Sequence, residues 1–415
     1  MDSMHLCFLN TLKAALEGVN ASFEEALSQQ ELEHLLRLAQ EHSVLPMIYG
    51  ATRPDPSLRR DFPGQMGAAR ASTLRQVGFQ VTRTVEFLAL QRHLEAAGLR
   101  PLVVKGLICR QLYPQPDARV SSDEDVLIRP EEFEAYHDAL LRFGMETSCD
   151  PDTMSRSYEV PYRKTDNRLY IELHKSLFPL DSDAYGDFNA FFEGAHERAT
   201  AEQIDGMTVW TLSPTDHLFY LICHAFKHFL HSGFGIRQVC DITLYANTYG
   251  AQVDWAHIVE NCRAIHADGF CAALFRIGEK YLTLDPDRAC LPAVWTDAEV
   301  DETLMLQDLL DGGIYGGADM NRRHSSAITL DAVAAQKQGR KAKGGIMVSL
   351  FPPLQTMRAR FHYLKKCPWL LPFAWVQRIL LYTSEIHETP ANSAVDSLKI
   401  GRERIEMMRV YGIIK

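Results

Sequence analysis

The sequence predicts an α+β fold in which a small core of mixed strands and helices lies between two helical regions. Residues 1–98 and 213–415 carry apolar side chains mainly at three- and four-residue spacing, which is typical of amphipathic helices. Residues 99–212 alternate short apolar runs with helical stretches, which favours a small mixed sheet. A chain of 415 residues is also too long to fold around a single small hydrophobic core. We therefore expect three units: 1–98, 99–212 and 213–415.

Composition narrows the class of protein. The net charge of −10 argues against nucleic acid as a partner. Nine cysteines without a C-x-x-C pair are typical of reduced thiols, so we expect a cytoplasmic protein. The N-terminus lacks the basic leader of a signal peptide. The sequence contains no run of about 18 apolar residues, so we expect no membrane span.

The elements follow in order along the chain. In the first unit, a proline-containing loop at 54–63 separates early helices from a long helix over Met66–Ala97, which Gly98 ends. In the core we expect strands at Leu102–Val104, Ser121–Ile128, Ser155–Arg163, Arg168–Lys175 and Met207–Leu212, and helices at Leu107–Tyr113 and Pro130–Phe143. Thr165-Asp166-Asn167 is predicted to be a hairpin turn, and the strand Met207–Leu212 is expected to close the sheet edge.

The last unit begins with Ser213-Pro214 at the start of a helix. Two interruptions follow. The glycine-rich loop Gly312–Gly317 lacks the spacing of a P-loop, and the basic stretch Lys337–Gly345 is interpreted as a solvated loop.

Acidic residues at the start of one predicted strand indicate a metal site. Because side chains alternate along a strand, Asp123 and Asp125 share a face and Glu124 lies on the other. Two neighbouring carboxylates repel each other unless a cation lies between them, which suits Mg²⁺. Glu172, on a separate strand and on the same face as Tyr170 and His174, is placed to be a third carboxylate. The alternative is that the aspartates only cap a turn or are solvated at a sheet edge.

A second feature precedes these acids. Lys105-Gly106 lies where a strand turns into a helix, so a positive charge and free backbone N–H groups are expected to meet phosphate oxygens. With the carboxylates, this turn indicates a metal-dependent site for a nucleoside triphosphate.

The ordered set of motifs resembles a known family. The string V-V-K-G…L-Y-P…R-x-S-S-D-x-D-x-L-I over 103–128 is followed by I-E-L-H at 171–174 and by H-x-x-K-H-F…G-I-R-Q-x-x-D over 224–241. This order resembles the bacterial uncharacterised nucleotidyltransferases, a branch of the DNA polymerase beta-like nucleotidyltransferase superfamily.

The resemblance implies a nucleotidyltransferase core and a reaction. A nucleoside monophosphate would pass from a nucleoside triphosphate, ATP being the first candidate, to a small molecule, peptide or saccharide, and pyrophosphate would leave. Asp123, Asp125 and Glu172 would be catalytic and would hold two Mg²⁺ ions. The residues implied in nucleotide binding are Lys105, Gly106, Arg119, Ser122, Lys227, His228, Arg237 and Asp241. The alternative is a nucleotide-binding or scaffold protein of the same fold without turnover.

A histidine-rich helix leaves three interpretations open. His217, His224, His228 and His231 recur on one face of the helix that begins at residue 214. They would bind zinc, or pack at a domain interface, or belong to one wall of the nucleotide cleft. In the last case Lys227, His228, Arg237 and Asp241 would lie near the phosphates or the acceptor.

Overall fold

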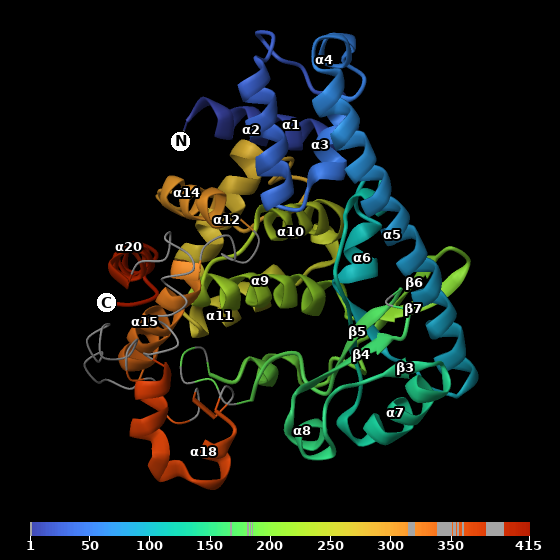
Figure 1. Ribbon diagram of the computed structural model, residues 1–415, viewed down its shortest axis with the longest axis vertical. Coiled ribbons are helices and arrows are strands. Elements are labelled where there is room, and N and C mark those ends of the chain that lie inside the picture. Colours follow the sequence, from blue (N-terminus) through green and yellow to red (C-terminus); the bar gives the residue numbers. More distant parts are fainter. Residues whose placement is uncertain are drawn as a thin grey trace.

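The computed structural model describes residues 2–166, 168–180, 182, 184, 186–313, 320–337, 351, 354, 357–358, 361–378 and 394–415. Asn167 of the predicted hairpin turn, residues 314–317 of the glycine-rich loop and residues 338–345 of the basic stretch lie outside this part. Helices surround a small mixed sheet, which confirms the α+β prediction (Figure 1).

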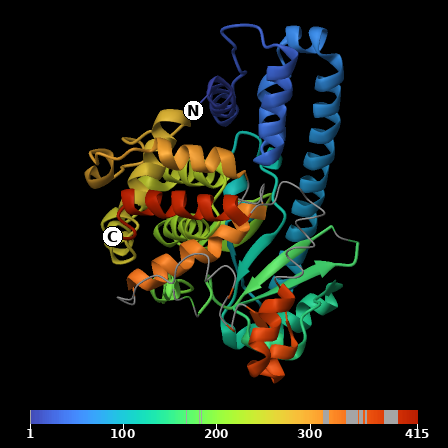
Figure 2. The ribbon, with the colours of Figure 1, turned by 60° about the vertical axis from the view of Figure 1, so that its left-hand side comes forward.

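The N-terminal region is helical, as predicted, but the predicted loop at 54–63 contains a short helix, Pro56–Asp61. It comprises α1 (Ser3–Glu17), α2 (Gln29–Glu41), α3 (Leu45–Thr52), α4 (Pro56–Asp61) and α5 (Pro63–Ala96). Ser28 caps the N-terminus of α2: its hydroxyl accepts from the Glu31 N–H, while the Glu31 carboxylate accepts from the Ser28 N–H. Helix α5 runs from this region down along the sheet (Figures 1 and 2).

The core contains a five-stranded sheet in the order β1-β2-β5-β4-β3. Strands β2 and β5 pair in parallel and the other neighbours are antiparallel. The strands are β1 (Leu102–Val104), β2 (Glu124–Leu127), β3 (Met145–Glu146), β4 (Glu159–Lys164) and β5 (Tyr170–His174), and the helices are α6 (Gly106–Arg110), α7 (Phe133–Arg142) and α8 (Pro151–Arg156). The strand predicted from Ser155 begins only at Glu159, because Asp150 caps the N-terminus of α8.

The strand predicted to close the sheet has a different partner. Strand β7 (Met207–Thr211) pairs with β6 (Thr200–Ile204) in a separate two-stranded sheet, so the prediction that it closes the edge of the main sheet is wrong. The two strands meet through Asp205 and Gly206, which both have positive φ, as a tight hairpin turn requires. Strand β7 contacts the main sheet through Thr211, whose Oγ1 donates to the Val103 carbonyl at 2.7 Å.

The C-terminal region is again helical. Its helices are α9 (Pro214–His231), α10 (Ile236–Tyr249), α11 (Trp255–Ala264), α12 (Asp268–Tyr281), α13 (Ala293–Thr296), α14 (Thr303–Gly312), α15 (Met320–Lys337), α18 (Tyr363–Lys366) and α20 (Ala394–Val410). In the described part of the chain, no helix has the length and apolar character needed to cross a membrane.

Two large apolar clusters cover the sheet, and a third, small one lies around α18. Side chains of β1 and β2 alternate between the two large clusters: Val103 and Val126 lie in the cluster with the end of α5 and with α7, whereas Leu102 and Leu127 lie in the cluster with α9. The second cluster also includes residues of α1–α3 and α10–α12. The sheet is therefore covered by apolar side chains on both faces. Its buried polar side chains, Glu124, Asp125 and His174, are exceptions that need an explanation.

His42, just after α2, predicts acid sensitivity of the fold. Its ring is fully buried, lies 5.3 Å from the Phe8 ring and places Nε2 3.2 Å from the Leu310 carbonyl of α14. Burial lowers its pKa to about 4. Because the unfolded histidine titrates near pH 6.5, the unfolded state binds more protons between about pH 6.5 and 4, and stability is lost as the pH falls.

His42→Gln, which keeps a donor for Leu310, should flatten this dependence by up to about 1.4 kcal/mol per pH unit in that window. Urea unfolding at several pH values measures it. The matched control is His34→Gln within α2, where the side chain is only half-buried. Parallel pH profiles for wild type and His42→Gln would show that His42 is not the acid-sensitive group.

Candidate active site

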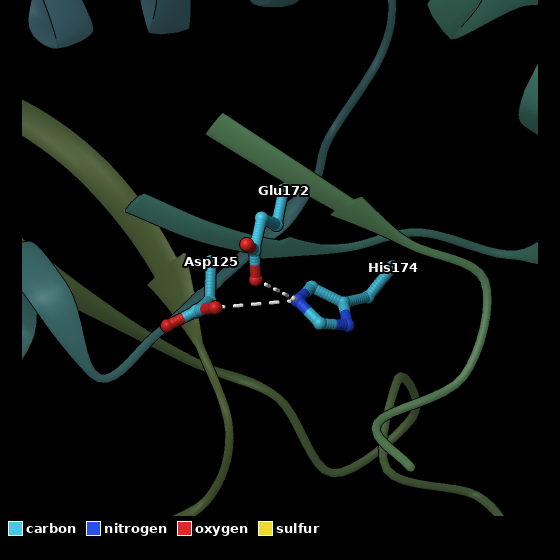
Figure 3. A group of neighbouring side chains, drawn as sticks. All are labelled: Asp125, Glu172 and His174. Carbon is cyan, nitrogen blue, oxygen red and sulfur yellow. Dashed lines mark hydrogen bonds and ion pairs between the residues drawn. The ribbon is translucent and has the colours of Figure 1, made fainter. Parts of the chain in front are cut away.

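The parallel pairing of β2 with β5 brings two carboxylates and an imidazole together. Asp125 lies opposite Glu172, and Leu127 lies opposite His174. His174 Nε2 is 3.2 Å from Asp125 Oδ1 and 3.8 Å from Glu172 Oε2 (Figure 3). Asp125 and His174 are buried, whereas the Glu172 side chain is 26% exposed. The site is therefore built into the sheet but open at Glu172.

The charged groups at this site strongly shift one another's pKa values. Burial raises the pKa of Asp125, but the Lys105 charge and the His174 hydrogen bond outweigh it, and the pKa lies well below its usual range. Burial lowers the pKa of His174, but the hydrogen bond and charge of Asp125, with Glu159 and Glu172, raise it above its ordinary value. Burial and the charge of Asp125 raise the pKa of Glu172 to about 7.

These three side chains suit a divalent metal ion. Among the described residues, one group of three His, Cys, Asp or Glu side chains has its ligand atoms all within 4.8 Å of one another: Asp125, Glu172 and His174. Carboxylate oxygens suit Mg²⁺, and an imidazole nitrogen extends the range to Mn²⁺ and other transition metals. Sequence reasoning missed His174 as a ligand, although it placed His174 on the same strand face as Glu172.

Asp123 lies outside this group. Strand β2 begins at Glu124, so Asp123 belongs to the preceding loop, where it is half-buried and accepts a hydrogen bond from Ser122 Oγ at 3.2 Å. Its negative charge nevertheless adds to the shift that raises the pKa of Glu172. A ligand role for Asp123 remains a prediction.

The Lys105-Gly106 turn contacts the acids differently from the expectation. Lys105 has φ 61° and ψ −114°, an uncommon conformation outside glycine, and its Nζ lies 2.8 Å from Asp125 Oδ2. Its N–H donates to His217 Nε2 at 3.1 Å, and the Leu107 N–H donates to Glu124 Oε2 at 2.8 Å. The prediction of free N–H groups at this turn is therefore wrong for Lys105 and Leu107.

The position of the Glu124 side chain explains why residue 106 is a glycine. A Cβ on Gly106 would lie 2.1 Å from Glu124 Oε2, so only glycine fits this approach. The other oxygen of Glu124 pairs with Arg110 Nη1 at 2.6 Å, and both side chains are at most 1% exposed. Glu124 lies on the face opposite Asp125, as the strand alternation predicts, and it fixes the first turn of α6.

The histidines of α9 lie against Lys105. His217 accepts from the Lys105 N–H through Nε2, and its Nδ1 is 3.2 Å from Thr211 Oγ1; burial lowers its pKa to about 3. His224 Nε2 is 3.5 Å from Lys105 Nζ, and its ring centroid is 4.6 Å from that of His228. Burial and the charges of Lys105 and Lys227 lower the pKa of His224 and His228. Neutral imidazoles thus form one wall beside the lysine.

The structure favours this wall over zinc binding. The metal-binding group found among the described residues includes no histidine of α9. Lys227, on the same helix, is partly buried, and its Nζ lies 5.9 Å from the centre of the Phe178 ring. Lys227 and His228 therefore remain candidates for phosphate contact from this helix.

The other predicted nucleotide ligands form two groups: Arg119 pairs with Asp241, and Ser122 and Arg237 line one cavity. Arg119 and Asp241 form a buried bidentate pair at 2.8 and 2.5 Å, and Tyr113 donates to Asp241 at 2.7 Å. The pair ties the loop before β2 to α10, and a nucleotide would have to break it to contact either side chain. Arg237 Nη1 donates to the Val120 carbonyl at 2.5 Å, while Ser122 is exposed on the same loop.

Comparison with known proteins identifies the family. A model of the uncharacterised nucleotidyltransferase family matches residues 28–283, which span α2 to α12 and every site residue discussed above. Searches of curated proteins and of solved structures give no significant match. Because the family model covers more than half of the 415 residues, this chain belongs to the uncharacterised nucleotidyltransferase family.

Proposed function

We propose that the protein is a divalent-metal-dependent nucleotidyltransferase. It transfers a nucleoside monophosphate from a nucleoside triphosphate, with ATP as the first candidate donor, to an acceptor hydroxyl or phosphate and releases pyrophosphate. The observation that supports this most strongly is the pairing of Asp125 with Glu172 across two parallel strands, next to the Lys105 ammonium. A cation and two carboxylates at one site suit a triphosphate and its metal.

In this proposal Asp125 would hold the Mg²⁺ of the triphosphate, with His174 beside it and Asp123 as a further ligand from the loop, and Glu172 would act on the acceptor side. Bound Mg²⁺ supplies charge neutralisation on the phosphates and lowers the pKa of the acceptor. Lys105 donates to phosphate oxygens, and Lys227 and His228 act from α9. The acceptor oxygen bonds to the α-phosphorus, the bond from that phosphorus to the pyrophosphate oxygen breaks, and Glu172 takes the acceptor proton.

The alternative function is nucleotide binding without turnover. The engaged N–H groups of Lys105 and Leu107 favour it, because they leave fewer backbone donors for phosphate. One assay distinguishes the two functions. The full chain is incubated with each α-labelled nucleoside triphosphate, Mg²⁺ or Mn²⁺, and a metabolite extract. Labelled product with equal pyrophosphate release supports transfer, and saturable binding without product supports the alternative.

Glu172→Gln tests the acceptor side of the reaction. Loss of a positioned base is expected to lower transfer about 10²–10⁴-fold while triphosphate binding is largely retained. Glu159→Gln is the matched control, because Glu159 Oε2 lies 3.7 Å from His174 Nδ1 but is not in the metal-binding group. Equal losses in the two variants, or a proportional loss of binding, would exclude this role for Glu172.

A further inference from the structure

A cavity lies beside the loop that leads into Asp123. It has a volume of about 500 Å³ and is bounded by the middle of α5, the loop before β2 and the start of α10. We call it the arginine pocket, and its lining includes Arg75, Gln80, Arg83 and Arg237 with the exposed Phe79. In the described part of the chain, no carboxylate lines it. Such a wall attracts anions.

Two buried side chains of this pocket carry hydrogen-bond donors that no described residue uses. Gln80 Oε1 accepts from the Ser121 N–H at 2.9 Å, which fixes the amide so that Nε2 is the free end. Arg83 donates from Nη1 to the Ser121 carbonyl. Gln80 is 1% exposed and Arg83 is 9% exposed, and Gln80 Nε2 and Arg83 Nε have no partner among the described residues. Both atoms are almost wholly inaccessible, so they line the wall behind the cavity surface, and the guanidinium groups of Arg75 and Arg237 are the donors nearest a ligand.

The remaining lining specifies the ligand further. Arg75 is exposed and makes no ion pair with any described residue, so its guanidinium is available. The Phe79 side chain is 53% exposed, and the Arg83 guanidinium lies 5.6 Å from the centre of its ring. Guanidinium groups bind phosphate in a bidentate manner, and an open aromatic ring suits a planar or apolar group beside it.

The pocket is distinct from the cations at Asp125. Ser121 and Ser122 line it and are followed directly by Asp123, whereas Lys105 and the histidines of α9 lie at Asp125. Burial lowers the pKa of Arg83, and the charges of Glu124 and Asp123 oppose this shift, so Arg83 lies within electrostatic reach of Asp123. Group transfer needs separate places for donor and acceptor, and the chain offers two separate cationic groups, Lys105 at Asp125 and the arginines beside the loop that leads to Asp123.

We propose that the arginine pocket binds the phosphate group of the acceptor, and that the acceptor is therefore a phosphate monoester. The proposal rests on the proposed function in one respect, since it assigns the triphosphate to the Lys105 side and the acceptor to the Arg75 side. The anion site itself stands on the three arginines that line the cavity and on the lack of any carboxylate among its described lining residues.

Phenyl phosphate is a suitable probe, because it combines a phosphate group with a ring for Phe79. Titration calorimetry on the full chain should show saturable binding, weakened about tenfold or more in Arg75→Ala, as expected for loss of a charge-assisted contact. Arg70→Ala is the matched control: Arg70 is exposed on the same helix and does not line the pocket. Its affinity should equal that of wild type.

A second titration with saturating Mg-ATP separates donor from acceptor. Unchanged affinity for phenyl phosphate is expected if the pocket serves the acceptor, and competition with ATP would overturn that assignment. No binding, or equal binding by wild type and Arg75→Ala, would overturn the anion site. If wild type binds phenyl phosphate but not ATP, the proposed function fails, whereas a protein that binds only ATP refutes the pocket alone.

Discussion

Asp125→Asn is expected to reduce nucleotide transfer at least about 10³-fold. The change keeps the size of the side chain but removes the charge that would hold the metal and that pairs with Lys105 at 2.8 Å. A metal ion supplies several kcal/mol of transition-state stabilisation, and each 1.4 kcal/mol is about tenfold in rate. The measurement is product formation from α-labelled ATP by wild type and variant at equal concentration.

Asp123→Asn provides the comparison. Asp123 lies in the loop outside the group of Asp125, Glu172 and His174, so its loss should cost less than the loss of Asp125. Melting temperature without nucleotide is the fold control. It should fall in Asp125→Asn, because Lys105 and His174 lose the carboxylate with which they interact. Retention of a tenth or more of wild-type transfer by Asp125→Asn would exclude the metal-binding role, and equal losses at both positions would return Asp123 to the site.

The sequence predicted the elements well where the signal is local. Helix α5 follows from the periodicity of Met66–Ala97, and β5 follows from the alternation around Glu172. The parallel register of β2 with β5 is not local, and it decides which acids meet. Asp123 and Asp125 share a face in any extended strand, but the strand starts after Asp123, so the structure pairs Asp125 with Glu172.

Partners from distant segments were also beyond sequence reasoning. Repulsion between two strand acids was the expected feature of this site, yet the nearest charge to Asp125 is the Lys105 ammonium. Arg119 and Asp241 are 122 positions apart, and only the packing of α10 shows that each neutralises the other. The arginine pocket likewise needs α5, the loop before β2 and α10 together: Ser121, Ser122 and Arg237 belong to the quoted motifs, but nothing in the sequence joins them to Arg75 and Arg83 of α5.

The largest effect on stability is expected from Glu124→Gln. Glu124 and Arg110 form an ion pair that is almost fully buried, and Glu124 also accepts from the Leu107 N–H at the start of α6. The amide can still accept a hydrogen bond but leaves the Arg110 charge buried without its acid. Removing one partner of a buried ion pair costs about 3–5 kcal/mol. Urea unfolding of the purified chain should show this loss in the free energy of unfolding.

Two further variants separate the charge from the shape. Arg110→Met in the Glu124→Gln background removes the unpaired charge, and because apolar replacement of a buried pair is often neutral, this double variant should be more stable than Glu124→Gln alone. Glu131→Gln, at an exposed position in the segment after β2, should stay within about 0.5 kcal/mol of wild type. If Glu124→Gln also stays within about 1 kcal/mol, or if the double variant is the less stable, the ion pair does not hold α6 in place. The turn at Lys105 would then depend chiefly on the close fit of Gly106 and on the bond from the Lys105 N–H to His217.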